Sequence, residues 1–374
     1  MSTKLKNKTI PKNWQQKQFV DCVDLVSQKK LKGFKKNEYK KSGQFPIVDQ
    51  GQSFISGYTN ESERVSNDVP LILFGDHTRI VKYIDFPFAI GADGTKLLKS
   101  VEDINTKFLY YYALNLEIPN TGYNRHFKLL KSSTVNIPPI HEQKKIADIL
   151  SAVDDDIEKT DEIIHKSEKL KKGLTKELLN KSNHLKKTKF SSLVKLRKEK
   201  SKIKNNFDER YIGLEHIEQE GGRLLGCGKS SETKSINSVF KKNDILFGKL
   251  RPYLRKYWKA KFDGVCTSEI LVFEPRLECD GDFILYLVQS EQFIQHSESK
   301  SFGTKMPRTD WKIISEFEIE IPPPERRKKI AEILSTIDKK IEINKQIKNK
   351  LTELKKGLMQ DLLSGDVRIN KIYA

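Results

Sequence analysis

The stretch GGRLLGCGKS, from Gly221 to Ser230, has the residue types of a phosphate-binding loop but not their spacing. Such a loop places four residues between its first glycine and the Gly-Lys-Ser unit, so that backbone amides wrap around the phosphates. Arg223 stands at the position of that first glycine, and Gly222 lies one residue too early. The pattern therefore predicts a hairpin with a glycine turn and no nucleotide site.

The acidic cluster Asp154–Asp156 offers the carboxylates that a nuclease would use to hold a metal ion. These residues are predicted to lie on one long helix, where consecutive side chains point in different directions. A second copy of the segment has Asp338-Lys339-Lys340 instead, which is typical of a solvated helix face. An adenine methyltransferase would need an Asn-Pro-Pro-aromatic stretch, and Pro-Pro occurs here only before helical segments. We expect neither a catalytic site nor a metal site.

The cysteines and the termini indicate an intracellular protein. Four cysteines, Cys22, Cys227, Cys266 and Cys279, form no C-x-x-C pair and have no histidine at zinc-ligand spacing. They are predicted to be free thiols in a reducing cytoplasm. The N-terminal segment lacks the apolar core of a signal peptide, and no run approaches the roughly 18 apolar residues of a membrane span.

The charge balance points to a polyanionic partner. Lys and Arg outnumber Asp and Glu by 69 to 50, which gives a net charge of +19. Such an excess favours DNA, RNA or an anionic membrane surface, although many basic proteins bind no nucleic acid. Phosphates would be held by Lys and Arg, whereas base edges would be read by Arg at guanine and by Asn or Gln at adenine.

Candidate DNA contacts lie in basic, glycine-containing loops of two modules. In the first module they are Arg79, Lys82, Lys96, Asn124, Arg125 and His126. In the second module they are Lys249, Arg251, Arg255, Lys305 and Arg308. For each residue the alternative is an ordinary surface side chain. The sequence does not separate base readers from phosphate contacts.

A repeated stretch of sequence follows each of these modules. The stretch IPPIHEQKKIADIL begins at Ile137 and returns as IPPPERRKKIAEIL from Ile321, 184 residues later. The same register continues without a gap to Leu179 and Leu363, and both tails contain LKKGL. Proline is tolerated in the first turn of a helix but not in its interior, so each copy predicts a strand end followed by a long helix.

Each repeated helix has an apolar stripe that it cannot bury alone. In the first copy Ile146, Ile149, Leu150, Val153 and Ile157 recur at steps of three and four residues, and the second copy has the same pattern. The stripes predict that the two helices pair as a coiled coil, and the repetition predicts that the pair is antiparallel. The alternative is that each helix packs only on its own module.

The segments before the two helices share an order of elements. Each module has a strand that passes through glycine into a basic segment, then a short helix, then a cationic loop, then a strand ending at IPP. The matched stretches are Leu71–Tyr83 with Asp244–Tyr257, Lys107–Leu114 with Asp282–Gln289, and Asn120–Leu130 with Ser301–Ile314. This duplication predicts a pseudo-two-fold arrangement of an α+β chain with two mixed α/β modules.

This organisation resembles the DNA-specificity subunits of type I restriction–modification enzymes. The resemblance rests on the two IPP…KKIA(D/E)ILS helix starts, their LKKGL tails and the opening IPKNWQQKQFVDCV, Ile10–Val23. It covers essentially the whole chain. It implies target-recognition domains at residues 1–136 and 182–320, a spacer helix at 137–181, and a second spacer helix with a tail at 321–374.

The resemblance also implies what the chain does and with whom. It implies a non-catalytic subunit that reads a bipartite DNA target with a fixed gap. Two methyltransferase subunits using S-adenosylmethionine, and nuclease/translocase subunits using ATP and Mg²⁺, would supply catalysis. Candidate partner contacts are the paired positions Lys144, Lys145, Lys328 and Lys329, for which helix solubility is the alternative. A stand-alone coiled-coil regulator is the rival interpretation, and a catalytic nuclease or methyltransferase is a third.

Overall fold

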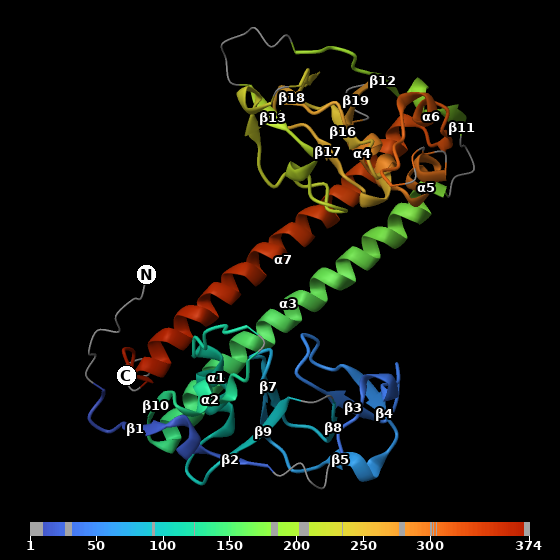
Figure 1. Ribbon diagram of the computed structural model, residues 1–374. Helices are drawn as coiled ribbons and strands as arrows, with labels where there is room; N and C mark the ends of the chain where they lie inside the picture. Colours follow the sequence, from blue (N-terminus) through green and yellow to red (C-terminus); the bar gives the residue numbers. More distant parts are fainter. Residues whose placement is uncertain are drawn as a thin grey trace. The chain divides into compact units, whose positions relative to one another are not determined.

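The computed structural model divides the chain into two compact units. It describes residues 10–26, 32–91, 94–122, 124–180, 186–201, 209–233, 235–276, 281–299, 301, 303 and 305–369. Unit 1 comprises Met1–Thr160 and Ile347–Ala374, and unit 2 comprises Asp161–Gln346. Each unit contains part of two long helices, α3 (Ile140–Asn180) and α7 (Pro324–Ser364) (Figure 1). Cys279 lies outside the described residues.

Unit 1 contains two four-stranded sheets. The antiparallel sheet has the order β2 (Val23–Leu25), β9 (Thr95–Ser100), β6 (Leu71–Gly75), β7 (Val81–Ile84). The mixed sheet has the order β4 (Gly57–Thr59), β3 (Phe45–Val48), β8 (Phe88–Ile90), β5 (Val65–Ser66), with β3 parallel to β8. All five residues of β6 are buried, which explains why LILFG is apolar without alternation.

Two short helices and a two-stranded ribbon complete unit 1. Helix α1 (Thr106–Asn115) begins where the Asn105 side chain accepts a hydrogen bond from the Phe108 amide. Helix α2 (Phe127–Lys131) precedes β10 (Thr134–Ile137), which pairs antiparallel with β1 (Gln15–Gln18). The ribbon carries the chain into α3.

Unit 2 repeats this plan strand for strand. Its antiparallel sheet has the order β12 (Val194–Leu196), β19 (Ile270–Pro275), β16 (Ile245–Gly248), β17 (Tyr257–Lys259). Its mixed sheet has the order β14 (Gly228–Lys229), β13 (Arg210–Ile212), β18 (Gly264–Cys266), β15 (Ser238–Phe240), with β13 parallel to β18. Helices α4 (Gly281–Gln289), α5 (Glu291–Ser299) and α6 (Trp311–Ser315) lead to β20 (Glu318–Ile321), which pairs with β11 (Lys186–Lys189).

The duplicated order of elements is therefore confirmed. The prolines mark the change from strand to helix in both copies. Strand β10 ends at Ile137, and α3 begins three residues later, at Ile140. In the second copy a third proline, Pro324, occupies the first position of α7, as the missing amide of proline allows. The stretch at Gly221 is a hairpin, as predicted, with Glu218 N–H donating to the Arg223 carbonyl.

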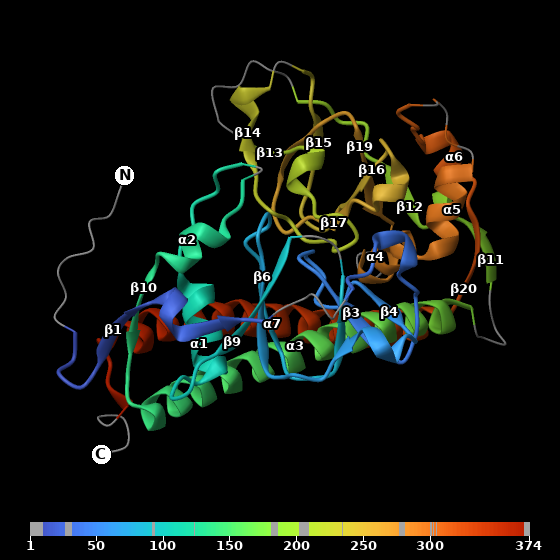
Figure 2. The same cartoon turned by 60° about the horizontal axis from the view of Figure 1, so that its bottom comes forward.

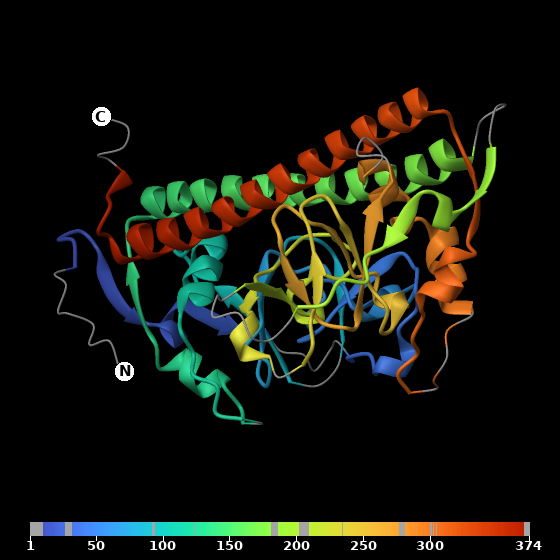
Figure 3. The same cartoon turned by 90° about the horizontal axis from the view of Figure 1, so that it is seen from above.

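The long helices pair antiparallel in each unit. In unit 1, Ile146 and Leu150 of α3 share a core with Leu362 and Leu363 near the end of α7. In unit 2, Leu179 at the end of α3 shares a core with Ile330 and Leu334 near the start of α7. Figures 2 and 3 show α3 and α7 side by side within each unit. The predicted antiparallel pairing and the α+β fold class are confirmed.

The segment that follows α7 packs against the N-terminal part of unit 1. Ile369 is buried in the core that also contains Trp14. The Arg368 guanidinium donates two hydrogen bonds, of 2.9 and 3.0 Å, to the buried Glu142 carboxylate, which also accepts from the Trp14 indole at 3.1 Å. These contacts tie the C-terminal segment to the first turn of α3.

One prediction about the long helices was wrong. Asp154 was expected on a solvated face, yet it accepts a hydrogen bond from Tyr111 Oη at 2.8 Å and pairs with Lys355 Nζ at 2.6 Å. Both partners lie far away in the sequence, so the run of three acids gave no sign of them. Asp155 and Asp156 are exposed, as expected.

Candidate nucleic-acid interface

The loop that follows β6 is held in place by three other segments of unit 1. The Asp76 carbonyl accepts from the His126 amide at 2.8 Å, and the Asp76 carboxylate accepts from the Phe127 amide at 2.8 Å. The Asp76 amide donates to the Gly94 carbonyl at 2.7 Å, and the His77 amide donates to Gln50 Oε1 at 3.2 Å. The predicted loops around Arg79 and Arg125, together with the segment containing Lys96, therefore meet at one edge of the sheets.

Two of the predicted DNA contacts in unit 1 are interior groups. Lys82 is only 4% exposed, and its ammonium donates to the carbonyls of Asp49 at 2.7 Å and Ser53 at 2.6 Å. Burial lowers the pKa of Lys82, against the opposing charge of Asp49. His126 is fully buried, with one ring nitrogen 3.0 Å from the Asp76 carbonyl oxygen. Both residues shape the loops, and neither presents a surface to a phosphate.

The other predicted residues of unit 1 remain accessible. Asn124 and Arg125 are exposed, and Lys96 is half-buried. Arg79 adopts a left-handed backbone conformation, with φ of 63°, and its guanidinium donates to the Ile118 carbonyl at 3.0 Å. Arg79 and Asn120 also line a cavity of about 650 Å³ beside this loop. These side chains form an open cationic edge.

Sequence reasoning missed Gln50, which lies at the same edge beside His77. Gly94, with φ of 85°, packs against both side chains: an added Cβ would lie 2.6 Å from Gln50 Nε2 and 2.7 Å from His77 Cδ2. Glutamine can read adenine through two hydrogen bonds. Gln50 is a weak sequence signal, because it follows the end of β3, and β3 pairs with β8, a strand far away in the sequence.

Unit 2 builds an equivalent loop after β16. The Lys249 carbonyl accepts from the Thr309 amide at 3.0 Å, and the Arg251 amide donates to the Pro307 carbonyl at 2.7 Å. Lys256 Nζ, like Lys82 in unit 1, donates to backbone carbonyls, here those of Leu214 and Ile217. The hairpin loop and the downstream cationic loop are joined in both units.

The five predicted residues of unit 2 fall into two groups. Arg255 donates to Glu291 at 2.7 Å, a hydrogen bond that lowers the pKa of the Glu291 carboxyl, and Arg308 donates to Glu269 at 3.1 Å. Lys249, Arg251 and Lys305 form no ion pair with the described part of the chain. The first group is partly neutralised, whereas the second is available to an anion.

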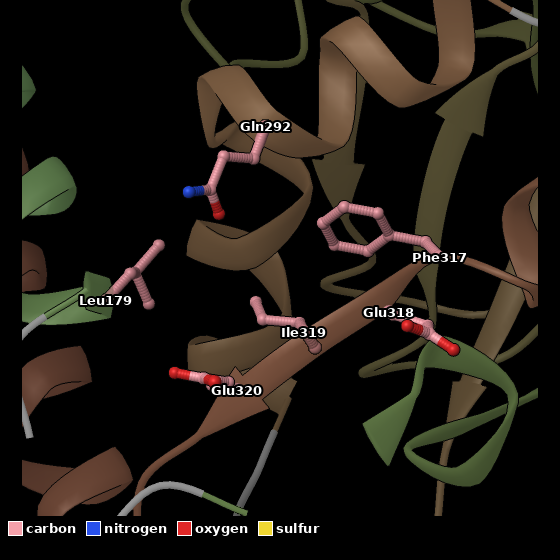
Figure 4. A pocket seen from close by; sticks show the side chains of 6 residues that line it. All are labelled: Leu179, Gln292, Phe317, Glu318, Ile319 and Glu320. Atoms are coloured by element: carbon pink, nitrogen blue, oxygen red, sulfur yellow. The ribbon is translucent and has the colours of Figure 1, made fainter. Parts of the chain in front are cut away.

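A separate cavity of about 380 Å³ in unit 2 is unsuited to nucleic acid. It is lined by Leu179, Gln292, Phe317, Glu318, Ile319 and Glu320. Figure 4 shows Glu318 and Glu320, both residues of β20, on either side of Ile319 along the strand. Two carboxylates at the rim repel phosphate groups.

The described ranges contain no group of three or more His, Cys, Asp or Glu side chains that could hold a metal ion. Within the same ranges, no helix combines the length and apolar character needed to cross a membrane. The predicted partner residues Lys144, Lys145, Lys328 and Lys329 are all exposed at the starts of α3 and α7.

Known proteins share this architecture. A family model described as "Type I restriction modification DNA specificity domain" matches residues 11–167 and again 186–353. The chain belongs to this family. Two matches in one chain agree with the two units, each with its own cationic loop pair, and confirm the resemblance drawn from the repeated helix starts.

Specificity subunits match either nearly the whole chain or a part of it. The MjaVIII specificity subunit of Methanocaldococcus jannaschii is 23% identical, over 97% of this chain and 95% of its own length. The EcoR124I/EcoR124II specificity subunit of Escherichia coli is 34% identical over 22% of this chain and 21% of its own length. The crystal structure of the type I S subunit from M. genitalium has a TM-score of 0.65 at 17% identity, covering 96% of this chain and 98% of that one. It shares the fold.

Proposed function

We propose that this chain reads a bipartite DNA target: two short words separated by a fixed number of unread base pairs. One observation carries the proposal. In each unit a hairpin loop after the central strand is joined by backbone hydrogen bonds to a downstream cationic loop, through Asp76 and His126 in one and Lys249 and Thr309 in the other. Two copies of one loop pair suit two half-sites.

The accessible polar and cationic side chains would make two kinds of DNA contact, to phosphates and to base edges. Lys96, Arg125, Lys249 and Lys305 suit phosphate contacts, which supply affinity that falls steeply with salt. Asn124 and Arg251 suit base edges, and Gln50 joins them as a candidate. Arg79, Arg255 and Arg308 are already oriented by protein partners, so they could reach DNA only from fixed positions. Lys82 and His126 would act indirectly, by holding the loops.

The paired helices α3 and α7 would set the gap between the words. For both reading units to meet one face of a duplex, the centres of the half-sites should lie about one turn apart, roughly 34 Å. The antiparallel pairing supports this role, because it attaches each reading unit to both helices at once.

Catalysis would belong to partner subunits. We propose that two methyltransferase subunits, which use S-adenosylmethionine, dock on the repeated helices, and that nuclease/translocase subunits, which use ATP and Mg²⁺, join them in the cytoplasm. The exposed lysines Lys144, Lys145, Lys328 and Lys329 are candidate contacts at two equivalent positions. The names of the relatives, which are specificity subunits of restriction enzymes, support this assembly.

Purification under mild conditions tests the proposal against its rival. A specificity subunit should copurify with a methyltransferase, and that complex should select a split DNA motif. The chain alone, given DNA with Mg²⁺ or S-adenosylmethionine, should neither cut nor methylate. A stand-alone regulator would instead bind one DNA word tightly without any partner, and that result would contradict the proposal.

A further inference from the structure

A cluster of three side chains in unit 1 joins α1 to both long helices, α3 and α7. Below, the reading domain of each unit means its two sheets and short helices, without the long helices. Tyr111 of α1 donates to Asp154 of α3 at 2.8 Å, and Lys355 of α7 pairs with the same carboxylate at 2.6 Å. The Lys355 ammonium also lies 5.3 Å from the centre of the Tyr111 ring. Each residue therefore contacts the other two, and each comes from a different helix.

Unit 2 contains the same cluster with the roles of the long helices exchanged. Tyr286 of α4 donates to Asp338 of α7 at 2.9 Å, and Lys171 of α3 pairs with Asp338 at 2.7 Å. The Lys171 ammonium lies 5.5 Å from the centre of the Tyr286 ring. Asp338 follows Asp154 by 184 residues, and Lys355 follows Lys171 by the same 184. The same three residue types therefore form one cluster in each unit.

The clusters are better shielded than the exposed ion pairs within α3. The lysine side chains are 18% and 19% exposed, whereas those of the Lys166–Glu162 pair of α3 are 77% and 58% exposed. Shielding strengthens an ion pair, while exposed pairs contribute little. Burial raises the pKa of both phenols, so each tyrosine remains a hydrogen-bond donor at neutral pH.

The geometry tolerates little displacement. A shift of one residue along a helix turns a side chain by about 100°, and a shift of one turn moves it by about 5.4 Å, which exceeds hydrogen-bonding reach. Tilting either reading domain on its helices would separate the tyrosine from its aspartate. The clusters thus fix the register of the two helices and the position of each reading domain on them.

We propose that Lys171 and Lys355 are positioning residues that determine which gap the protein accepts between its two DNA words. They touch no base. They act by clamping each reading domain to both helices, through the Tyr286–Asp338 and Tyr111–Asp154 pairs. This inference rests on the proposed bipartite function.

The test measures binding to a series of duplexes that keep both words and change only the gap, by one or two base pairs. The full chain is used in the complex in which it purifies. The variant Lys171→Met/Lys355→Met removes the lysine, and with it the ion pair, from both clusters. The matched control, Lys172→Met/Lys356→Met, removes two exposed lysines from the same helices, also 184 residues apart, so that net charge changes equally.

Discrimination is the affinity for the native gap divided by the affinity for a neighbouring gap. We expect this ratio to fall by about threefold to tenfold in the Lys171→Met/Lys355→Met variant, because shielded ion pairs are lost. Its preference for the words should stay unchanged. The control should keep the wild-type profile, and Lys171→Arg/Lys355→Arg, which retains the charge, should recover most of the discrimination. Should the double variant unfold, Lys355→Met alone serves the same comparison.

Two results would overturn the inference: unchanged gap discrimination in the clamp variant, or an equal loss in the control. Failure of the proposed function looks different, because the wild-type complex itself would then ignore the gap. That flat profile would be seen before any variant is measured.

Discussion

At the scale of residues, the basic loops contain cations of two kinds. The ammonium groups of Lys82 and Lys256 donate to backbone carbonyls, whereas Arg125 and Lys305 are exposed. Glycine and clustered cations mark these loops in the sequence. It could not separate the two kinds, because the carbonyls that bind Lys82 lie about thirty residues away, at Asp49 and Ser53.

Replacing Lys82 and replacing Arg125 should have opposite consequences. Lys82→Met leaves buried carbonyls without their donor, so the free energy of unfolding should fall by about 1–3 kcal/mol. Arg125→Met should leave stability unchanged but weaken DNA binding and reduce the slope of log affinity against log salt by about 1. Urea unfolding and a salt titration of binding measure the two effects. A stable Lys82→Met protein with weakened DNA binding would show that Lys82 contacts DNA after all.

Asp49 should make unit 1 sensitive to acid. Burial acts to raise the pKa of this carboxyl, but hydrogen bonds from Ser56, Gly51 and Tyr39, with the charge of Lys82, outweigh burial and lower it. A pKa that is lowered on folding stabilises the protein above the unfolded value, about 3.9, and the benefit disappears as the pH falls through the folded value. Wild type should therefore exceed Asp49→Asn in unfolding free energy near neutral pH, and the difference should shrink in acid. A difference that grows on acidification would contradict this assignment.

At the scale of elements, the repeat gave the long helices, their proline starts and their pairing. The apolar stripe at three- and four-residue steps was sufficient, because burial of that stripe decides how the helices pack. The short helix α6 and the role of Asp154 were not foreseen. A run of three aspartates looks solvated along the helix, and only the tertiary contacts with Tyr111 and Lys355 distinguish Asp154 from its neighbours.

The C-terminal segment should be part of the stability of unit 1. Glu142 is buried, and Arg368→Ala would remove its charged partner while leaving the carboxylate inside. We expect the free energy of unfolding to fall by about 2–4 kcal/mol, with Glu142→Gln/Arg368→Ala less damaging than the sum of the two single changes. Lys169→Ala, at an exposed position on α3, serves as the control. Additive effects in urea unfolding would argue against the buried pair.

At the scale of the whole molecule, the chain contains two copies of one fold and two copies of one long helix. This duplication suits a protein in which each unit reads one DNA word and the helices set the spacing between the words. Inserting seven residues into both α3 and α7 keeps the apolar stripes in phase and lengthens each helix by about 10.5 Å. The accepted gap should then grow by roughly three base pairs while both words stay the same. Binding to duplexes of graded gap length measures the change. An altered word with an unaltered gap would show that the helices do not set the spacing.

The central claim is that the two units read separate words. Selection from a random duplex library tests it most directly, using the full chain in the complex in which it purifies. The account predicts one split motif with an invariant gap, and mutation of the candidate base reader Asn124 should alter only one of its words. A single uninterrupted word, or no word at all, would contradict the account, because one of the two loop pairs would then have no part in reading DNA.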